Sequence, residues 1–180
     1  LADALEGNVG LHDASNIAAV IVEPCAGSTG FLPPPKGYLK RLREITRKHG
    51  ILLIFDEVKT GFRLANGGAQ AYFGVKADLA AYAKAMGNGY PVAAFGGKAH
   101  VMDVVGSHTG GVVHGGTYTA NMVALSAAHA TLDILAHTDA MATIDRVGRD
   151  IQALLGRVFT QAGVAHAFAG PPAMLGIHFT

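Results

Sequence analysis

Two continuous apolar runs, separated by one amphipathic segment, constrain the fold of this chain most. The runs are IAAVIV at residues 17–22 and ILLIF at residues 51–55. Apolar runs of this length without polar alternation are typical of strands buried on both faces of a parallel sheet. Residues 37–49 place apolar side chains at helical spacing and are followed by Gly50, which predicts an amphipathic helix. The pattern therefore predicts a β-α-β unit with parallel strands and a right-handed crossover.

The rest of the chain continues this alternation of strands and helices. Short apolar segments predict strands at residues 78–83 and 92–95, and helical periodicity predicts helices at residues 121–136 and 144–158. Gly163 is expected to end the second of these helices. Together with a hydrophobic fraction of 50% and a charged fraction of 15%, this organisation predicts an ordered α/β protein.

The two ends of the chain read differently from its centre. Residues 1–16 are polar and predict irregular structure, whereas residues 173–180 read as a strand that is cut off as it begins to pair. We therefore place a boundary near residue 165, with one domain at 1–164 and the start of another at 165–180. Because the first residue is Leu1 rather than methionine, we expect an internal fragment of a longer enzyme.

Charge and cysteine content exclude several classes of protein. With 14 basic and 13 acidic residues, the chain has no basic surface dense enough to predict nucleic-acid binding. Cys25 is the only cysteine, which excludes an internal disulfide and fits a reducing, cytoplasmic compartment. Neither a signal peptide nor an apolar run of membrane-spanning length is found, so we expect a soluble protein.

Asp56 and Glu57 follow the second apolar run directly. In an open parallel sheet the carboxyl ends of the strands form the ligand site, so these acids are candidate functional groups. The plainer interpretation is an acid that caps the next turn. A third interpretation is the magnesium-binding strand of a phosphate-loop ATPase. That strand requires a GxxxxGK[ST] motif, and the single GGK of this chain is followed by Ala99.

Lys84 is the second candidate, because it lies in an otherwise apolar segment. Burial disfavours a charged ammonium and favours a neutral amine, which is a nucleophile. A neutral lysine at the end of a strand is what a Schiff base to an aldehyde cofactor requires. A paired lysine, or one whose charge reaches solvent, is the structural alternative.

Three other features are weaker. Gly115-Gly116-Thr117 before a predicted helix is suited to holding a phosphate, although glycine before a helix is common. The nine histidines show no metal-ligand spacing, so we expect no metal site, and His129 is expected to pack within a helix. Cys25 has no evident base beside it and is expected to be a core thiol.

Taken together, these segments resemble the class III aminotransferases, the pyridoxal-phosphate enzymes that include omega-transaminases and glutamate-1-semialdehyde 2,1-aminomutase. The resemblance covers nearly the whole chain. Its most specific parts are LIFDEVKTGFR at residues 53–63, DLAAYAKAMGNGYPV at residues 78–92 and GTYTAN at residues 116–121. It implies the fold type I, aspartate-aminotransferase-like architecture, with a mostly parallel sheet in the large domain and the start of a small C-terminal α+β domain.

The resemblance also implies roles for individual residues. Asp56 would pair with the pyridine nitrogen of pyridoxal 5'-phosphate (PLP), and Val58 would pack on the ring. Lys84 would hold the cofactor as a Schiff base and then carry the proton during transfer. Thr117 would contact the cofactor phosphate, in this family usually that of the neighbouring subunit, which implies a homodimer with shared active sites.

The sequence motifs are compatible with more than one reaction of this family. AGSTG at residues 26–30 and PPPKGYL at residues 33–39 are similar to omega-transaminases, whereas TGFR at residues 60–63 and GGAQ at residues 67–70 are more similar to the aminomutases. Ser28 stands where the aminomutases tend to have asparagine. We favour an aminotransferase that moves an amino group between an amine or amino acid and a keto acid or aldehyde. The alternatives are the aminomutase and a fragment without activity of its own.

Overall fold

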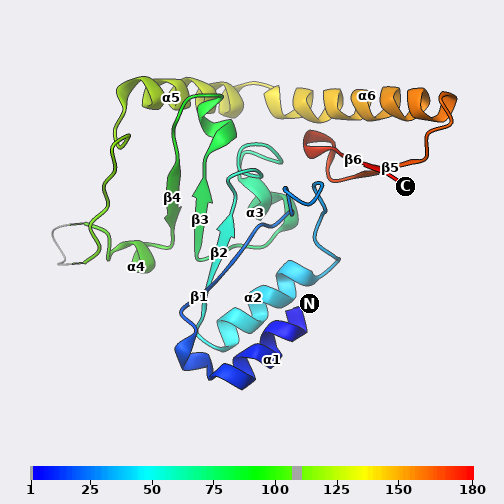
Figure 1. Cartoon of the computed structure of the whole chain (residues 1–180). Coiled ribbons are helices and arrows are strands. Elements are labelled where there is room, and N and C mark those ends of the chain that lie inside the picture. The colour runs from blue at the N-terminus through cyan, green and yellow to red at the C-terminus, as the bar shows by residue number, and fades with distance from the viewer. Residues whose placement is uncertain (1, 107–110) are drawn as a thin grey trace.

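A four-stranded sheet forms the centre of the molecule, a computed structural model that describes residues 2–106 and 111–180 (Figure 1). The strands are β1 (Ala19–Val22), β2 (Leu52–Asp56), β3 (Leu79–Tyr82) and β4 (Ala94–Gly97), in that spatial order. The first three run parallel, and β4 pairs antiparallel with β3. The predicted α/β class and mostly parallel sheet are therefore confirmed. The antiparallel direction of β4 was not predicted.

The predicted β-α-β unit is confirmed. Helix α2 (Tyr38–Lys48) connects β1 to β2, whose register pairs Val20 with Leu53. The face of α2 that carries Leu39 and Leu42 packs with Leu53 and Phe55 of the sheet in one buried cluster. Burial of these apolar side chains provides the main driving force for the unit, at about 1.5–3 kcal/mol for each large side chain.

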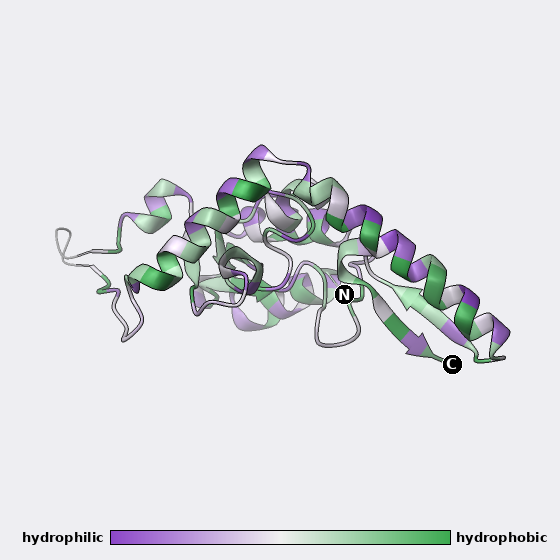
Figure 2. Ribbon diagram, turned by 90° about the horizontal axis from the view of Figure 1, so that it is seen from above, coloured by the Kyte–Doolittle hydropathy of each residue, from purple (hydrophilic) through white to green (hydrophobic). Residues whose placement is uncertain are grey.

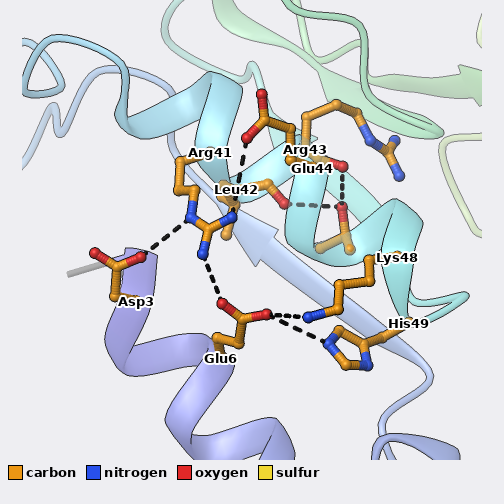
Figure 3. A network of polar contacts seen from close by, with 9 residues as sticks. Asp3, Glu6, Arg41, Leu42, Arg43, Glu44, Lys48 and His49 are labelled. Carbon is orange, nitrogen blue, oxygen red and sulfur yellow. Dashed lines mark hydrogen bonds and ion pairs between the residues drawn. The ribbon is translucent and has the colours of Figure 1, made fainter.

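The prediction of irregular structure for residues 1–16 is wrong. Helix α1 covers Ala2–His12, followed by a short 3-10 helix, η1 (Ala14–Asn16). The helix has only a weak apolar stripe, so its periodicity did not predict it. Its acidic side chains meet basic ones of α2, as Figure 3 shows: Glu6 lies between Arg41 at 2.6 Å and Lys48 at 2.6 Å. Contact with α2 therefore supports a helix that its own pattern does not specify.

The segments around β2 and β4 contain regular structure in addition to the predicted elements. The segment after β2 includes a short helix, α3 (Gly68–Phe73). Strand β4 continues to Gly97, beyond the predicted strand at residues 92–95, and a side chain on Gly97 would collide with the Asp78 carbonyl. Helix α4 (Ala99–Met102) follows β4.

Helices α5 (Met122–His137) and α6 (Ala140–Gln161) confirm the two predicted C-terminal helices, with α6 longer than expected. They lie nearly end to end along one side of the molecule (Figure 1). Hydrophobic and hydrophilic residues alternate along α6 (Figure 2), and several apolar residues of its stripe are only partly covered, Leu154 being 53% exposed. Gly163 adopts a left-handed φ of 68° just after α6, as a helix-ending glycine does.

The last segment forms a separate antiparallel pair, β5 (His166–Ala169) and β6 (Gly176–Phe179), joined by the 3-10 helix η4 (Pro172–Met174). The predicted strand at the end of the chain is thus present in β6. Helix α6 packs on η4 so closely that Gly148 has no room for a side chain against Pro172. The pair also meets the loop after β1, where the His178 ring lies 3.0 Å from the Gly30 carbonyl oxygen.

Candidate active site

Asp56 and Lys84 lie at the carboxyl ends of two neighbouring parallel strands. Asp56 is the last residue of β2 and is in register with Ala81 of β3. Lys84 follows β3 and begins the 3-10 helix η2 (Lys84–Gly87). Since carboxyl ends of parallel strands meet at one edge of a sheet, the fold brings the two predicted residues to the same edge.

Asp56 is partly buried and holds the turn that follows it. Its Oδ1 accepts a hydrogen bond from the Val58 backbone N–H at 3.0 Å. Within residues 2–106 and 111–180, no recorded donor reaches Oδ2. One carboxylate oxygen is therefore used locally, and the other remains able to accept a proton-bearing nitrogen.

Lys84 does not have the desolvated environment that its apolar neighbours predicted, because its side chain is exposed. The apolar residues around it turn inward instead: Ala80 and Met86 are buried. The Lys84 backbone has a left-handed φ of 45°, which is uncommon outside glycine and is found disproportionately at functional sites. No ion pair to Lys84 is recorded in the described part of the chain, so its amine is available to a ligand.

Glu57 is a structural residue. Its carboxylate is completely buried and accepts hydrogen bonds from Thr60 Oγ1 at 3.0 Å, the Ala69 N–H at 2.5 Å and the Gln70 N–H at 3.3 Å. Gly68, at φ 62°, leaves the space that this carboxylate fills. Glu57 thereby fixes the loop after β2.

The same loop contacts the strand that leads to Lys84. The Gln70 side-chain amide donates to the Tyr82 hydroxyl at 3.0 Å. Burial raises the pKa of the Tyr82 hydroxyl, and the negative charge of Glu57 adds to this effect. The loop that follows Asp56 is therefore held both by the Glu57 carboxylate and by Tyr82 of β3.

Among the described residues, no group of three His, Cys, Asp or Glu side chains is placed to hold a metal ion.

A cavity of about 800 Å³ opens beside Lys84. Three cationic side chains line it, namely Lys59, Arg63 and Lys84, and none of its lining residues is acidic. The opposite wall is mostly apolar and comes from α6 and from residues 172–177. A smaller cavity of about 530 Å³ on the other side of the turn is also lined by Arg63 and Lys84.

The four predicted site residues are not all brought together. Lys84 lines both cavities, whereas Asp56, Val58 and Thr117 line neither. Val58 is tied to Asp56 through its backbone, and Thr117 is exposed in the turn before α5. Cys25 is fully buried, as expected of a core thiol, and burial raises its pKa. His129, expected to pack within a helix, is exposed on α5.

Sequence reasoning missed the presence of Lys59 and Arg63 at this cavity. Arg63 Nε donates to the Ala173 carbonyl oxygen at 2.9 Å, across 110 residues of chain. Lys59 Nζ lies 2.8 Å from Ser28 Oγ. Both partners lie far away in the sequence, so no local pattern could have indicated the cationic wall.

The donor set fits the pyridoxal phosphate that the family resemblance implies. An exposed primary amine at one strand end is suited to condensation with an aldehyde. A carboxylate with an unused oxygen at the next strand end is suited to a protonated pyridine nitrogen.

Among the described residues, none of the helices combines the length and the apolar character needed to cross a membrane.

The chain is similar in sequence to an aminomutase and in structure to transaminases. A glutamate-1-semialdehyde 2,1-aminomutase of Natranaerobius thermophilus is 41% identical over 165 residues, which are 92% of this chain and 38% of that protein. An omega-transaminase structure from Sphaerobacter thermophilus has 37% identity and a TM-score of 0.85, over 98% of this chain and 40% of that one. A transaminase structure with PLP bound has 28% identity and a TM-score of 0.85, over 100% of this chain and 42% of that one.

This chain therefore spans about two fifths of the length of the proteins it resembles. The family model for class III aminotransferases matches residues 4–180. The order of strands, the positions of Asp56 and Lys84 and this match lead to one conclusion: the chain belongs to the class III aminotransferases.

Proposed function

We propose that the full-length protein is a PLP-dependent aminotransferase that moves an amino group between an amine or amino acid and a keto acid or aldehyde. The observation that carries this proposal is the position of Asp56 and Lys84 at the carboxyl ends of neighbouring parallel strands, in a chain of the class III family. Bound PLP supplies an aldehyde that condenses with amines and a ring that accepts electrons.

Lys84 provides the amine that attaches the cofactor and later moves a proton. Its Nζ has no ion pair among the described residues and faces the cavity, so a substrate amine is able to replace it. Once displaced, Lys84 Nζ would shuttle the proton between the substrate carbon and the cofactor carbon. The left-handed backbone at Lys84 holds the amine at the start of η2 rather than within β3.

Asp56 and Val58 position the ring. The free Oδ2 of Asp56 would hold the protonated ring nitrogen, while Oδ1 accepts the hydrogen bond of the Val58 N–H. A carboxylate at this nitrogen favours its protonated form. Val58, half-buried in the following turn, would pack its side chain against the ring.

Thr117 completes the site from a second copy of the chain in this proposal. It is exposed just before α5, in a region where Val113 and Tyr118 are 82% and 70% exposed and Met122 is 74% exposed. Large apolar side chains at such exposure favour a protein interface. A homodimer that covers them places the Thr117 hydroxyl at the partner's cofactor phosphate.

Residues 165–180 are proposed to begin the small C-terminal domain, after residues 1–164 of the large one. The separate sheet of β5 and β6 supports this division. We place the protein in the cytoplasm, in keeping with the free thiol of Cys25.

The aminomutase reaction is the second candidate, since the aminomutase of Natranaerobius thermophilus is similar over most of the chain. It moves an amino group within one molecule and needs no acceptor. Turnover of glutamate 1-semialdehyde by the full-length protein, without any keto acid, distinguishes it from the transaminase. A requirement for the keto acid favours the transaminase.

The assignment is tested by absorption spectroscopy of the full-length protein with PLP. We expect a visible band from the lysine-bound cofactor that Lys84→Ala abolishes. Lys76→Ala is the matched control, because Lys76 is an exposed lysine outside both cavities. A band that persists in Lys84→Ala, or one that never forms in the wild-type protein, contradicts the proposal.

A further inference from the structure

The cationic wall of the larger cavity contains three positive side chains, and the proposed function gives a role to one of them. Lys84 accounts for one of its three cations, and no acid among the lining residues balances Lys59 or Arg63. Uncompensated cations in a concave site raise the local concentration of anions. The charge pattern therefore favours an anionic group in the ligand, in addition to the amine that reacts.

Arg63 is held in place by contacts that leave its charged end free. Its backbone N–H donates to the Thr60 carbonyl at 3.2 Å and its Nε donates to the Ala173 carbonyl at 2.9 Å. No bond from its two terminal nitrogens is recorded in residues 2–106 and 111–180. An arginine fixed through Nε presents these nitrogens as a pair, which is the geometry that binds a carboxylate.

The residue before Arg63 contributes to this orientation. Phe62 has a left-handed φ of 57°, which is strained for an aromatic residue. Its ring packs against Tyr82, with centroids 5.6 Å apart, on the strand that leads to Lys84. The same aromatic contact thus links the turn that carries Arg63 to the strand that precedes Lys84.

Lys59 is less suited to the same task. One of its N–H bonds is directed to Ser28 Oγ at 2.8 Å, and an ammonium is a point charge without a paired geometry. Gly27 leaves room for this side chain, because a side chain there would collide with Lys59. Lys59 adds positive potential to the wall, and Arg63 supplies the directed contact.

We propose that Arg63 is the specificity-determining residue of this cavity and binds a carboxylate of the substrate. The inference rests on the proposed function, in which Lys84 reacts with the amine of the same molecule. The substrate class is an amine or carbonyl compound with a carboxylate at one end and an apolar body. That body packs on the opposite wall, formed by Ile144, Val147, Ile151, Leu155, Met174 and Ile177.

A purely structural Arg63 would instead tether residues 172–174 to the turn after β2. The substitution Arg63→Gln separates the two roles, since glutamine keeps an N–H donor for the Ala173 carbonyl and loses the charge. Arg63→Lys restores the charge without the paired donors. Arg157→Ala is the control, because Arg157 is exposed on α6 and does not line the cavity.

The test is calorimetric titration of the full-length, PLP-loaded protein with 3-phenylpropionate and with its neutral analogue 3-phenylpropionamide. Neither probe has an amine or ketone, so binding does not depend on amino transfer. We expect Arg63→Gln to weaken binding of the carboxylate roughly 10- to 100-fold and to leave the amide unchanged. Arg63→Lys is expected to recover part of the loss, and Arg157→Ala to behave as the wild-type protein.

Unchanged carboxylate affinity in Arg63→Gln overturns the proposal, and so does an equal loss for acid and amide, which indicates a tether. Failure of the wild-type protein to bind the carboxylate more tightly than the amide overturns it as well. The cofactor absorption band is recorded on the same samples. Its absence contradicts the aminotransferase assignment, whereas a normal band with unaltered affinities contradicts only the role of Arg63.

Discussion

Strands β2 and β3 differ between their two ends in how some of the charged side chains are paired. At the amino ends, Asp78 is buried and accepts from the Leu53 N–H at 2.8 Å, Arg43 at 2.6 Å and Lys98 at 2.6 Å. At the carboxyl ends, neither Arg63 nor Lys84 has an ion pair among the described residues, and both face cavities.

This comparison distinguishes charged side chains that stabilise the fold from charged side chains that are available to bind a ligand. Asp78 joins three elements, β2, α2 and the end of β4, and every interaction it makes is internal. Removing one partner of a buried pair leaves the other charge unpaired. Arg63 and Lys84 at the opposite edge have no ion pair among the described residues, so their charges remain available to a ligand.

The largest effect is expected from Asp78→Ala. Arg43, whose side chain is only 12% exposed, would lose its ion pair, and its Nε already has no hydrogen-bond partner among the described residues. We expect the free energy of unfolding to fall by about 3–5 kcal/mol, measured by urea denaturation. Asp150→Ala, at an exposed position of α6, is the control, and a loss as small as that of the control would remove the distinction between the two edges.

At the carboxyl edge, Asp56→Asn is expected to affect activity instead of stability. Asparagine keeps an oxygen for the Val58 N–H but no longer favours a protonated pyridine nitrogen. We expect the rate of amino transfer to fall roughly 100-fold, or about 2.7 kcal/mol of activation free energy. The urea midpoint should stay close to that of the wild-type protein, and a large drop in it would assign Asp56 a structural role.

Acid should reduce the contribution of Asp78 to folding stability over a defined range of pH. The pKa of Asp78 is lowered from 3.8 to about 2; burial opposes this shift, and the Leu53 N–H, Lys98 and Arg43 outweigh it. A folded pKa below the unfolded value stabilises above pH 4, and this contribution of about 2 kcal/mol is lost as pH falls toward 2. The stability difference between wild type and Asp78→Asn should therefore shrink over this range; a constant difference would refute the linkage.

The smallest effect is expected at the exposed contact between α1 and α2. Glu6 is hydrogen-bonded to Arg41 and Lys48 (Figure 3), but such surface pairs contribute little to stability and are screened by salt. Glu6→Gln should shift the melting temperature by no more than about 2 °C, and the shift should disappear at high salt. A larger, salt-independent shift would mean that paired charges at the surface matter as much as those around Asp78.

Local sequence patterns predict the central β-α-β unit, whereas the features that they did not predict depend on tertiary contacts. The runs at residues 17–22 and 51–55 and the amphipathic face of α2 specify the β-α-β unit by periodicity alone. Helix α1 lacks a strong stripe and depends on α2 for its partners. The antiparallel direction of β4 depends on its pairing with β3, which no local pattern encodes.

The sequence indicates candidate residues at the strand ends, but not the side chains that surround them. The motifs around Asp56 and Lys84 identified the family that the comparison then established. The exposure of Lys84 was missed, because the apolar residues next to it are the ones that face inward. The contact between Arg63 and Ala173 joins residues 110 positions apart, so the cavity and its cationic wall emerge only from the fold.

The most direct test of the account is to identify the lysine that binds the cofactor. The full-length protein is loaded with PLP, reduced with borohydride to make the linkage permanent, digested, and its peptides are analysed by mass spectrometry. The account predicts a phosphopyridoxyl group on Lys84 alone. A label on Lys59, Lys98 or another lysine, or no label at all, would contradict it.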